Sequence, residues 1–267
     1  YVKKQAINEK PFFLYFAFPS PHAPIIPNDQ FDGKSGAGPY GDFVYETDDA
    51  CGRILNALEQ SGQADNTIVI FTADNGPEGY AYKRDETFDH WSAEPFRGLK
   101  RDIYEGGHHV PFIIKWPGVT EAGSTCDKLV SQIDFMGTIA SSLGYKLPDN
   151  AAEDSHDLLP LLKGKKANSR TVHVHNTRES SWAIRVGEWN LIVGKTGYHS
   201  RVHKSWEEKR NYPADDEDAV ELYHYAKDIS QRNNLAKKFP KKVAELQKEL
   251  KISRERGFTA PRLVGSR

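Results

Sequence analysis

The chain has 267 residues, in which 36 lysines and arginines balance 37 aspartates and glutamates, and 38% of the residues are hydrophobic. This length suits one large domain or one domain with a smaller companion. The balanced charge argues against general binding to nucleic acid or to a membrane surface, and no apolar run approaches the ~20 residues that a membrane-spanning helix needs.

The first predicted elements are a strand and a helix, separated by a proline-rich loop. Residues 11–18 form a continuous apolar run, which predicts a strand buried on both faces. Prolines then stiffen the loop around His22. Residues 42–60 carry apolar side chains at helical spacing and predict an amphipathic helix, and Gly62 suits its C-terminal end.

The next predicted strand, residues 67–72, is followed by Asp74, Asn75 and Gly76. Successive side chains of a regular strand point to opposite faces. Asp74 and Asn75 therefore serve one ion only if the chain leaves strand geometry there, which Gly76 would allow through a positive φ. Asn75-Gly76 also suits a hairpin turn. Because no second strand pattern follows directly, a metal site is the favoured interpretation.

Beyond this point the pattern predicts a long polar loop, another strand and another helix. The loop extends to about residue 104, residues 110–116 predict a buried strand, and residues 132–143 predict a helix. Strands that alternate with helices indicate a mostly parallel sheet. The fold class predicted for residues 1–165 is therefore α/β, with a mostly parallel sheet flanked by helices.

The pattern changes near residue 165, where Lys163-Gly164-Lys165-Lys166 predicts a domain boundary. Residues 166–267 are predicted to form a small antiparallel sheet with one packing helix. Between its strands, residues 195–219 predict a long loop. The expected strands are 171–175, 182–186, 189–193 and 221–225, with Gly187-Glu188 as a hairpin turn and a helix that opens at Pro240 and carries Val243, Leu246 and Leu250 on one face.

Two side chains are suited to binding a tetrahedral anion. His22 lies in a stiff loop and can donate a proton to an anionic ester or to its leaving oxygen. Lys100 follows Arg97-Gly98-Leu99 and can neutralise the oxygens of sulfate or phosphate as a point charge. Each residue, taken alone, is explained more simply as a solvent-facing loop residue.

Other histidines and acidic residues carry weaker interpretations. Glu105 could bind a metal, but a structural role at the double-glycine turn is preferred. His108-His109 opens a predicted strand, so the two rings should point oppositely and not share an ion. His173 and His175 share a strand face and could bind zinc, although no third ligand is apparent.

Three more features favour structural roles. Asp48-Asp49 lies within a predicted helix and is expected to be solvated. Cys51 and Cys126 form no metal-spacing motif, and a buried thiol is expected at Cys51. The tract from Lys195 to Arg210 mixes basic and aromatic residues and could grip an anionic sugar, with a solvated loop as the alternative.

Taken in order, these motifs resemble those of the sulfatase family, of arylsulfatase type, within the alkaline-phosphatase-like superfamily. The matching segments cover nearly the whole chain and are 10–14, 21–24, 71–76, 97–100, 104–111, 158–162, 221–223 and 233–235. The resemblance implies hydrolysis of sulfate esters with a bound calcium ion and a formylglycine made from a cysteine or serine. It also implies that Asp74 and Asn75 bind the calcium ion. His22 and Lys100 would contact the sulfate and assist the leaving group.

The chain departs from the family pattern at the nucleophile. The family carries it in a motif of the type Cys-x-Pro-Ser-Arg, and neither Cys51 nor Cys126 has that surrounding sequence. The first aspartate pair of the family's calcium site is also absent. The resemblance therefore implies the later half of a sulfatase, with the formylglycine expected upstream of Tyr1. It implies an incomplete calcium site and no turnover from this chain alone.

Two alternatives remain open. A phosphate or phosphonate ester hydrolase of the same superfamily would often use a second metal, although the loops around Lys100 and His22 favour the sulfate branch. A non-catalytic fragment that binds sulfated glycans would explain the missing nucleophile and the tract from Lys195 to Arg210. The family implies a periplasmic or secreted location and a sulfated small molecule or glycan as the partner.

Overall fold

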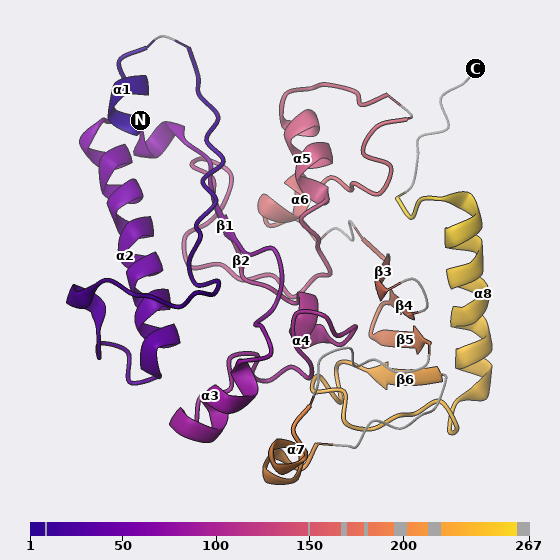
Figure 1. Cartoon of the computed structure of the whole chain (residues 1–267). Coiled ribbons are helices and arrows are strands. Elements are labelled where there is room, and N and C mark those ends of the chain that lie inside the picture. The colour runs from indigo at the N-terminus through magenta and orange to yellow at the C-terminus, as the bar shows by residue number, and fades with distance from the viewer. Residues whose placement is uncertain are drawn as a thin grey trace. The chain divides into compact units, whose positions relative to one another are not determined.

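The computed structural model of the chain describes residues 1–8, 10–148, 150–166, 170–178, 181–194, 202–212 and 220–260 (Figure 1). The chain divides into two compact units, which are considered separately. Unit 1 comprises Tyr1–Phe71, Tyr80–Ser92 and Ile113–Pro117, and unit 2 comprises Thr72–Gly79, Ala93–Phe112 and Gly118–Arg267. The predicted domain boundary near residue 165 stays a prediction.

Unit 1 is mainly helical. Its helices are α1 (Val2–Gln5), η1 (Asp29–Phe31), α2 (Gly38–Gln60), η2 (Ala64–Asn66) and α3 (Ala81–Phe88). Helix α2 confirms the predicted helix and begins four residues earlier than expected (42 − 38), with a proline in its first turn. Gly62 follows its end with φ +68°.

The start of α2 is fixed by a buried carboxylate. Asp42 is 2% exposed and accepts hydrogen bonds from the backbone amides of Gly33 at 3.0 Å and Ser35 at 2.8 Å. These hydrogen bonds hold the pKa of Asp42 below its usual value, against the opposing effect of burial. Further along the same helix, Asp48 and Asp49 are exposed, as predicted.

The apolar run 11–18 does not form the predicted buried strand. None of its residues belongs to a strand, and Phe13 and Tyr15 are 85% and 81% exposed. An extended segment becomes a strand only when a neighbour supplies hydrogen bonds, and within the described part of unit 1 no strand pairs with this run. The prediction of a strand is therefore wrong for this structure, and the run leaves apolar side chains in water.

Strands β1 (Val69–Thr72) and β2 (Phe112–Lys115) form a two-stranded sheet. They lie within the two segments predicted as strands, but β2 is not buried, since Ile113 is 61% exposed. The larger, mostly parallel sheet predicted for residues 1–165 is not seen in the described residues. Between these strands, helix α3 replaces part of the predicted polar loop, and Tyr82 stacks on Trp91 with ring centroids 5.4 Å apart.

Unit 2 contains a four-stranded sheet and most of the buried apolar side chains. Its elements are α4 (Glu105–His108), α5 (Asp134–Ser142), α6 (Leu159–Leu162), β3 (Val172–Arg178), β4 (Ser181–Val186), β5 (Trp189–Val193), α7 (Lys204–Arg210), β6 (Val220–His224) and α8 (Pro240–Arg256). The strands pair antiparallel in the order β3-β4-β5-β6. Gly187 adopts φ +56° in the turn where Val186 pairs with Trp189, which confirms the predicted hairpin.

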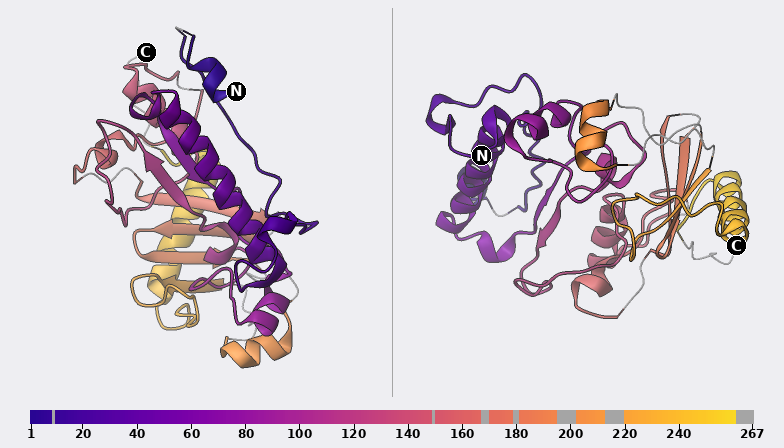
Figure 2. Two further views of the ribbon diagram at one scale, coloured as in Figure 1. Left: turned by 90° about the vertical axis from the view of Figure 1, so that its left-hand side faces the viewer. Right: turned by 90° about the horizontal axis from the view of Figure 1, so that it is seen from below.

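Helix α8 covers one face of this sheet (Figure 2). Leu246 and Leu250 of α8 pack against buried residues of the three strands β4, β5 and β6, which are Ile184, Leu191 and Leu222. Pro240 begins the helix and Gly257, with φ +80°, ends it. The predicted small antiparallel sheet with one packing helix is therefore confirmed.

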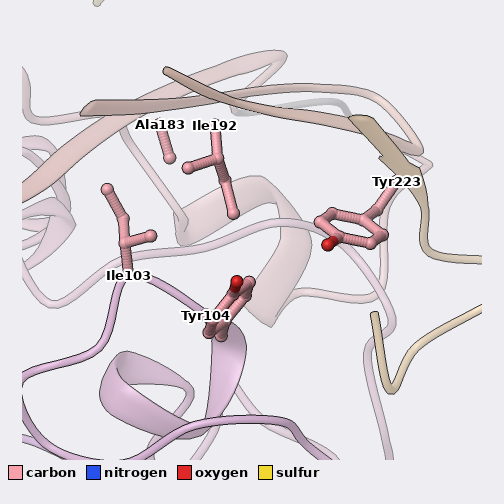
Figure 3. Packing of buried hydrophobic residues seen from close by; sticks show 5 residues of the cluster. All are labelled: Ile103, Tyr104, Ala183, Ile192 and Tyr223. Atoms are coloured by element: carbon pink, nitrogen blue, oxygen red, sulfur yellow. The ribbon is translucent and has the colours of Figure 1, made fainter. Parts of the chain in front are cut away.

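The opposite face of the sheet packs against a loop whose residue Tyr104 precedes the first residue of the sheet by 68 positions (172 − 104). Ile103 and Tyr104 point toward Ala183, Ile192 and Tyr223 (Figure 3). All five residues are at most 1% exposed. Because side chains alternate between faces along a strand, β6 presents Leu222 to α8 and Tyr223 to the loop.

Three further features concern the cysteines, a buried ion pair and the length of the helices. Both cysteines are free thiols; Cys51 is partly buried, and burial raises its pKa. In unit 2, Arg170 and Asp134 form an ion pair at 2.5 Å whose side chains are both 0% exposed, which ties the start of α5 to the chain just before β3. No helix in the described parts of the chain is long and apolar enough to span a bilayer.

Candidate functional site

The loop after β1 carries the two predicted metal ligands. The strand ends at Thr72, and the backbone bends at Asp74 and Asn75, so the chain leaves strand geometry where the prediction requires it. The Asn75 amide nitrogen donates to the Asp74 carboxylate at 2.6 Å, and Gln132 donates to the carbonyl of Ala73 at 2.5 Å. Asp74 is exposed and Asn75 is partly buried.

Gly76 serves a different purpose from the predicted one. It is not among the glycines with positive φ, but a Cβ atom placed on it would lie 1.8 Å from the carbonyl oxygen of Gly106. Its amide donates to the carbonyl of Gly107 at 2.9 Å. The prediction of a left-handed glycine is therefore wrong: glycine is needed because two backbones approach closely. No hairpin forms at Asn75-Gly76, since the partner of β1 is β2.

Lys100 lies in a tightly held turn. Gly98 has φ +83°, the amide of Leu99 donates to the Asp102 carboxylate at 2.7 Å, and the amide of Lys100 donates to the carbonyl of Pro77 at 2.9 Å. Lys100 itself is partly buried. The loop with Lys100 is thus hydrogen-bonded to the segment that directly follows Asp74 and Asn75, within unit 2.

His22 belongs to unit 1. It is exposed, and its Nδ1 atom lies 2.7 Å from the carbonyl oxygen of Ala23. The loop is tied to α2 by a hydrogen bond of 2.7 Å between the hydroxyls of Ser20 and Thr47. Its participation in a site with Lys100 stays a prediction.

Glu105 has the structural role that its place in the double-glycine turn suggests. It is 6% exposed, and its carboxylate contacts His109 at 2.6 Å and His108 at 3.5 Å and accepts a hydrogen bond from the hydroxyl of Tyr225. Burial alone would raise the pKa of Glu105, but the histidine and tyrosine contacts outweigh burial and hold the pKa well below its usual value.

The prediction for His108 and His109 is wrong in one respect. These residues do not open a strand: His108 ends α4, His109 follows it, and β2 begins three residues later (112 − 109). On a helical turn, both imidazoles reach the carboxylate of Glu105. The two rings therefore share a carboxylate rather than diverging.

His173 and His175 lie on one face of β3, as predicted, but their rings stack with centroids 5.3 Å apart. The ring of His108 lies 4.0 Å from that of His175. Burial lowers the pKa of His173 to about 4, and burial also lowers the pKa of His175. In the described residues no group of three or more His, Cys, Asp or Glu side chains is arranged to hold a metal ion, so the zinc interpretation gains no support.

The tract from Lys195 to Arg210 falls partly outside the described residues, which exclude 195–201 and with them Tyr198, His199 and Arg201. Its described end forms helix α7 rather than a loop. Trp206 is 1% exposed and packs against Tyr212 with ring centroids 5.0 Å apart. This tryptophan is therefore a core residue and not an exposed platform for a sugar.

A buried polar network that the sequence did not predict lies beneath the Lys100 loop. It consists of Arg97, Tyr104, Glu221, Tyr223 and Gln231, all at most 2% exposed. The alternation of Glu221 and Tyr223 in β6, continued by Tyr225 directly after it, was visible in the sequence. Polar and aromatic side chains at every second position of a strand beside a core indicate that this face meets polar groups.

Comparison with known proteins supplies a family. The Sulfatase family profile matches residues 1–145, and a profile described as the C-terminal part of N-sulphoglucosamine sulphohydrolase matches residues 98–193. The chain is 35% identical over 260 residues to an N-acetylgalactosamine-6-O-sulfatase of Bacteroides thetaiotaomicron. The alignment covers 93% of this chain and 48% of that protein. It is 40% identical over 166 residues to the N-acetylgalactosamine-6-sulfatase of Mus musculus, which covers 62% of this chain and 31% of that protein.

The solved structures agree with this assignment. A structure described under the metabolism of multiple glycosaminoglycans by Bacteroides thetaiotaomicron superposes with a TM-score of 0.75 at 34% identity, over 91% of this chain and 50% of that chain. The chain spans about half the length, or less, of the relatives it matches.

Proposed function

Because this chain belongs to the sulfatase family, we propose that it forms the later part of an enzyme that hydrolyses sulfate esters. The observation that carries the proposal is the hydrogen bond of 2.9 Å from the Lys100 amide to the carbonyl of Pro77. It joins the loop of a cationic side chain to the loop of two oxygen-bearing side chains, Asp74 and Asn75. A cation and metal ligands on adjoining loops suit the binding of a tetrahedral anion.

Lys100 and His22 have complementary roles in the proposal. Negative charge on the sulfate oxygens and on the bridging oxygen must be stabilised as the ester bond breaks. Lys100 would bind the sulfate oxygens through its ammonium group. His22 would donate a proton to the leaving alkoxide oxygen from its exposed imidazole.

Asp74 and Asn75 fit a calcium ion in donor type but not in number. Both bring side-chain oxygens, the ligands that calcium prefers, and the 2.6 Å contact between them holds the two groups together. Calcium takes about 6–8 oxygen ligands, so most of the ligands would come from outside this loop. A bound calcium ion would add positive charge beside the sulfate.

The nucleophile and the protein surface that covers residues 11–18 are both proposed to lie outside this chain. Neither cysteine stands in the family's formylglycine motif, so the nucleophile would be supplied upstream. The apolar run 11–18 supports the same conclusion, since Phe13, Tyr15 and Phe16 are 85%, 81% and 55% exposed in unit 1. Apolar side chains at this density normally pack against protein. We infer that the upstream half of the enzyme covers them.

A carbohydrate sulfate is the proposed substrate class. The support is the 35% identity to an N-acetylgalactosamine-6-O-sulfatase over 93% of this chain. A sulfated N-acetylhexosamine is therefore the first substrate to test, with aryl sulfate as a general reporter. A periplasmic or secreted enzyme would meet such substrates outside the cytoplasm.

The test uses the chain joined to its upstream half and compares N-acetylgalactosamine 6-sulfate with the corresponding 6-phosphate. We expect sulfate release to dominate. Lys100→Ala should lower kcat/KM at least ~100-fold, whereas Lys128→Ala, at an exposed lysine of unit 2, should leave it within about twofold.

Faster release of phosphate would favour a phosphate ester hydrolase. Binding of sulfated glycan without turnover would favour a non-catalytic protein. Turnover by the 267-residue chain alone would contradict the need for an upstream nucleophile.

A further inference from the structure

Beneath the Lys100 turn, polar side chains from two distant parts of the sequence meet in the interior of unit 2. Arg97 donates to the hydroxyl of Tyr223 at 3.1 Å and to the carbonyl of Gln231 at 3.0 Å. Its guanidinium lies 4.1 Å from the centre of the Tyr104 ring. The hydroxyls of Tyr104 and Tyr223 both donate to one carboxylate oxygen of Glu221, at 2.9 and 2.5 Å. One residue of β6, Glu221, thus anchors two tyrosines, one from each segment.

A second set of contacts holds the other end of the turn. The amide of Glu105 donates to the side-chain oxygen of Gln231 at 2.8 Å, and Tyr225, directly after β6, donates to the Glu105 carboxylate. Gln231 is 0% exposed. Residues 97 to 105, which contain Lys100, are therefore held at both ends by the segment that begins with β6.

Close backbone packing extends this support to the proposed metal loop. The amide of Gly106 donates to the carbonyl of Arg97 at 2.7 Å, and the amide of Gly76 donates to the carbonyl of Gly107 at 2.9 Å. A Cβ atom on Gly106 would lie 2.2 Å from the carbonyl oxygen of Gly98. Because no side chain separates these backbones, a shift of the Arg97 turn would displace Lys100 and the loop of Asp74 together.

The two faces of β6 differ in a way that stability alone does not explain. Leu222 faces α8 in an apolar cluster, whereas Glu221 and Tyr223 direct their polar groups at the Lys100 turn. Burying a charged carboxylate and a guanidinium costs free energy that an apolar core would avoid. What such a network supplies is a fixed geometry, as a catalytic lysine requires within about 0.5 Å.

We propose that Glu221 and Tyr223 are positioning residues for Lys100. They fix the turn of Arg97 and Tyr104 from the C-terminal sheet and, through the glycine-packed backbones, align the lysine with the loop of Asp74 and Asn75. The C-terminal sheet then fixes the position of Lys100 in the active site, in addition to forming a domain of its own. This proposal rests on the proposed function for the role of Lys100, but the physical linkage stands on the contacts alone.

Hydrogen exchange of single amides in the 267-residue chain tests the linkage. Tyr223→Phe removes one hydroxyl and keeps the ring. We expect the amides of Leu99, Lys100 and Gly106 to exchange about tenfold faster. The amides of Ile184 and Leu191, which lie in the β4–β5 ladder, should change less than about twofold. Glu221→Gln should act in the same direction. Tyr145→Phe, at a tyrosine 63% exposed, is the matched control and should change none of them.

Kinetics of the chain joined to its upstream half test the consequence. We expect Tyr223→Phe to lower kcat for sulfate release about tenfold, with the melting temperature changed by no more than about 2 °C. Unchanged exchange at Leu99 and Lys100, equal acceleration across all of unit 2, or an unchanged kcat would each overturn the proposal. If the unsubstituted protein releases no sulfate, the proposed function fails, and the exchange data alone then decide whether β6 holds the Lys100 turn.

Discussion

The apolar run 11–18 of unit 1 and the four-stranded sheet of unit 2 have similar β-type sequences but opposite fates. In the sheet, Ile184, Leu191 and Leu222 are each 0% exposed, whereas Phe13 in the run is 85% exposed. Strands β3, β4 and β5 follow one another closely, so short connections bring these partners together, and β6 joins β5 after a longer connection. An apolar run that belongs to a larger sheet depends on partner strands that are remote in sequence. The comparison teaches that an apolar pattern specifies a strand only where its partners are at hand.

The largest expected effect lies in the sheet. Leu222→Ala removes a 0% exposed side chain from the cluster between β6 and α8 and should lower the free energy of unfolding by about 3 kcal/mol. Urea denaturation followed by tryptophan fluorescence measures it. The matched control is Leu143→Ala in α5's C-terminal cap, which is 76% exposed and should cost less than about 1 kcal/mol. Equal losses of unfolding free energy at the two leucines would show that the cluster between β6 and α8 contributes no more to stability than an exposed position.

The sequence predicted the second half of the fold better than the first. Strands β4, β5 and β6, the Gly187-Glu188 turn and helix α8 all follow from local patterns, namely alternation, a two-residue turn, and a proline-led amphipathic helix. The run 11–18 has an equally strong local pattern. It was predicted wrongly because burial depends on contacts that the run itself does not encode.

The candidate site was predictable in its residue types but not in its support. The bend at Asp74 and Asn75 after a strand was predicted from residues that end an apolar run. The close approach of Gly76 to Gly106 and the anchoring of the Lys100 turn by Glu221 were not. The Gly76–Gly106 approach joins residues 30 positions apart (106 − 76), and the Tyr104–Glu221 hydrogen bond joins residues 117 positions apart. Single-sequence periodicity carries no information about such pairs.

A change of pH is expected to have an intermediate effect on the free energy of unfolding, through a buried histidine of unit 2. Burial lowers the pKa of His173 to about 4, and electrostatic interactions with Arg170 and His108 add to the shift, while those with Glu105 and Asp134 oppose it. The unfolded chain, with a histidine pKa near 6.5, binds the proton more readily than the folded chain. Stability is therefore fully present above about pH 6.5 and falls as the pH drops, by about 2 kcal/mol at pH 5 (about 1.4 kcal/mol per pH unit).

Urea denaturation at pH 7, 6 and 5 measures this dependence. His173→Asn should reduce the slope by about half, since His175 also has a pKa lowered by burial. His90→Asn, at an exposed histidine of unit 1, should leave the slope as it is. A chain whose stability rises between pH 7 and pH 5 would show that these imidazoles are not buried against the Lys100 loop.

The smallest change in the free energy of unfolding of the 267-residue chain is expected in unit 1. This prediction tests most directly whether residues 11–18 lack partners within unit 1. Phe13→Ser replaces an 85% exposed ring and should change the free energy of unfolding of the 267-residue chain by less than about 0.5 kcal/mol. The same substitution in the chain joined to its upstream half should cost about 3 kcal/mol, because the ring would then be buried. A ring that costs nothing in either form would mean that the upstream half does not cover the run. A large cost in the isolated chain would mean that residues 11–18 find partners within unit 1, and the contrast with the self-contained sheet would disappear.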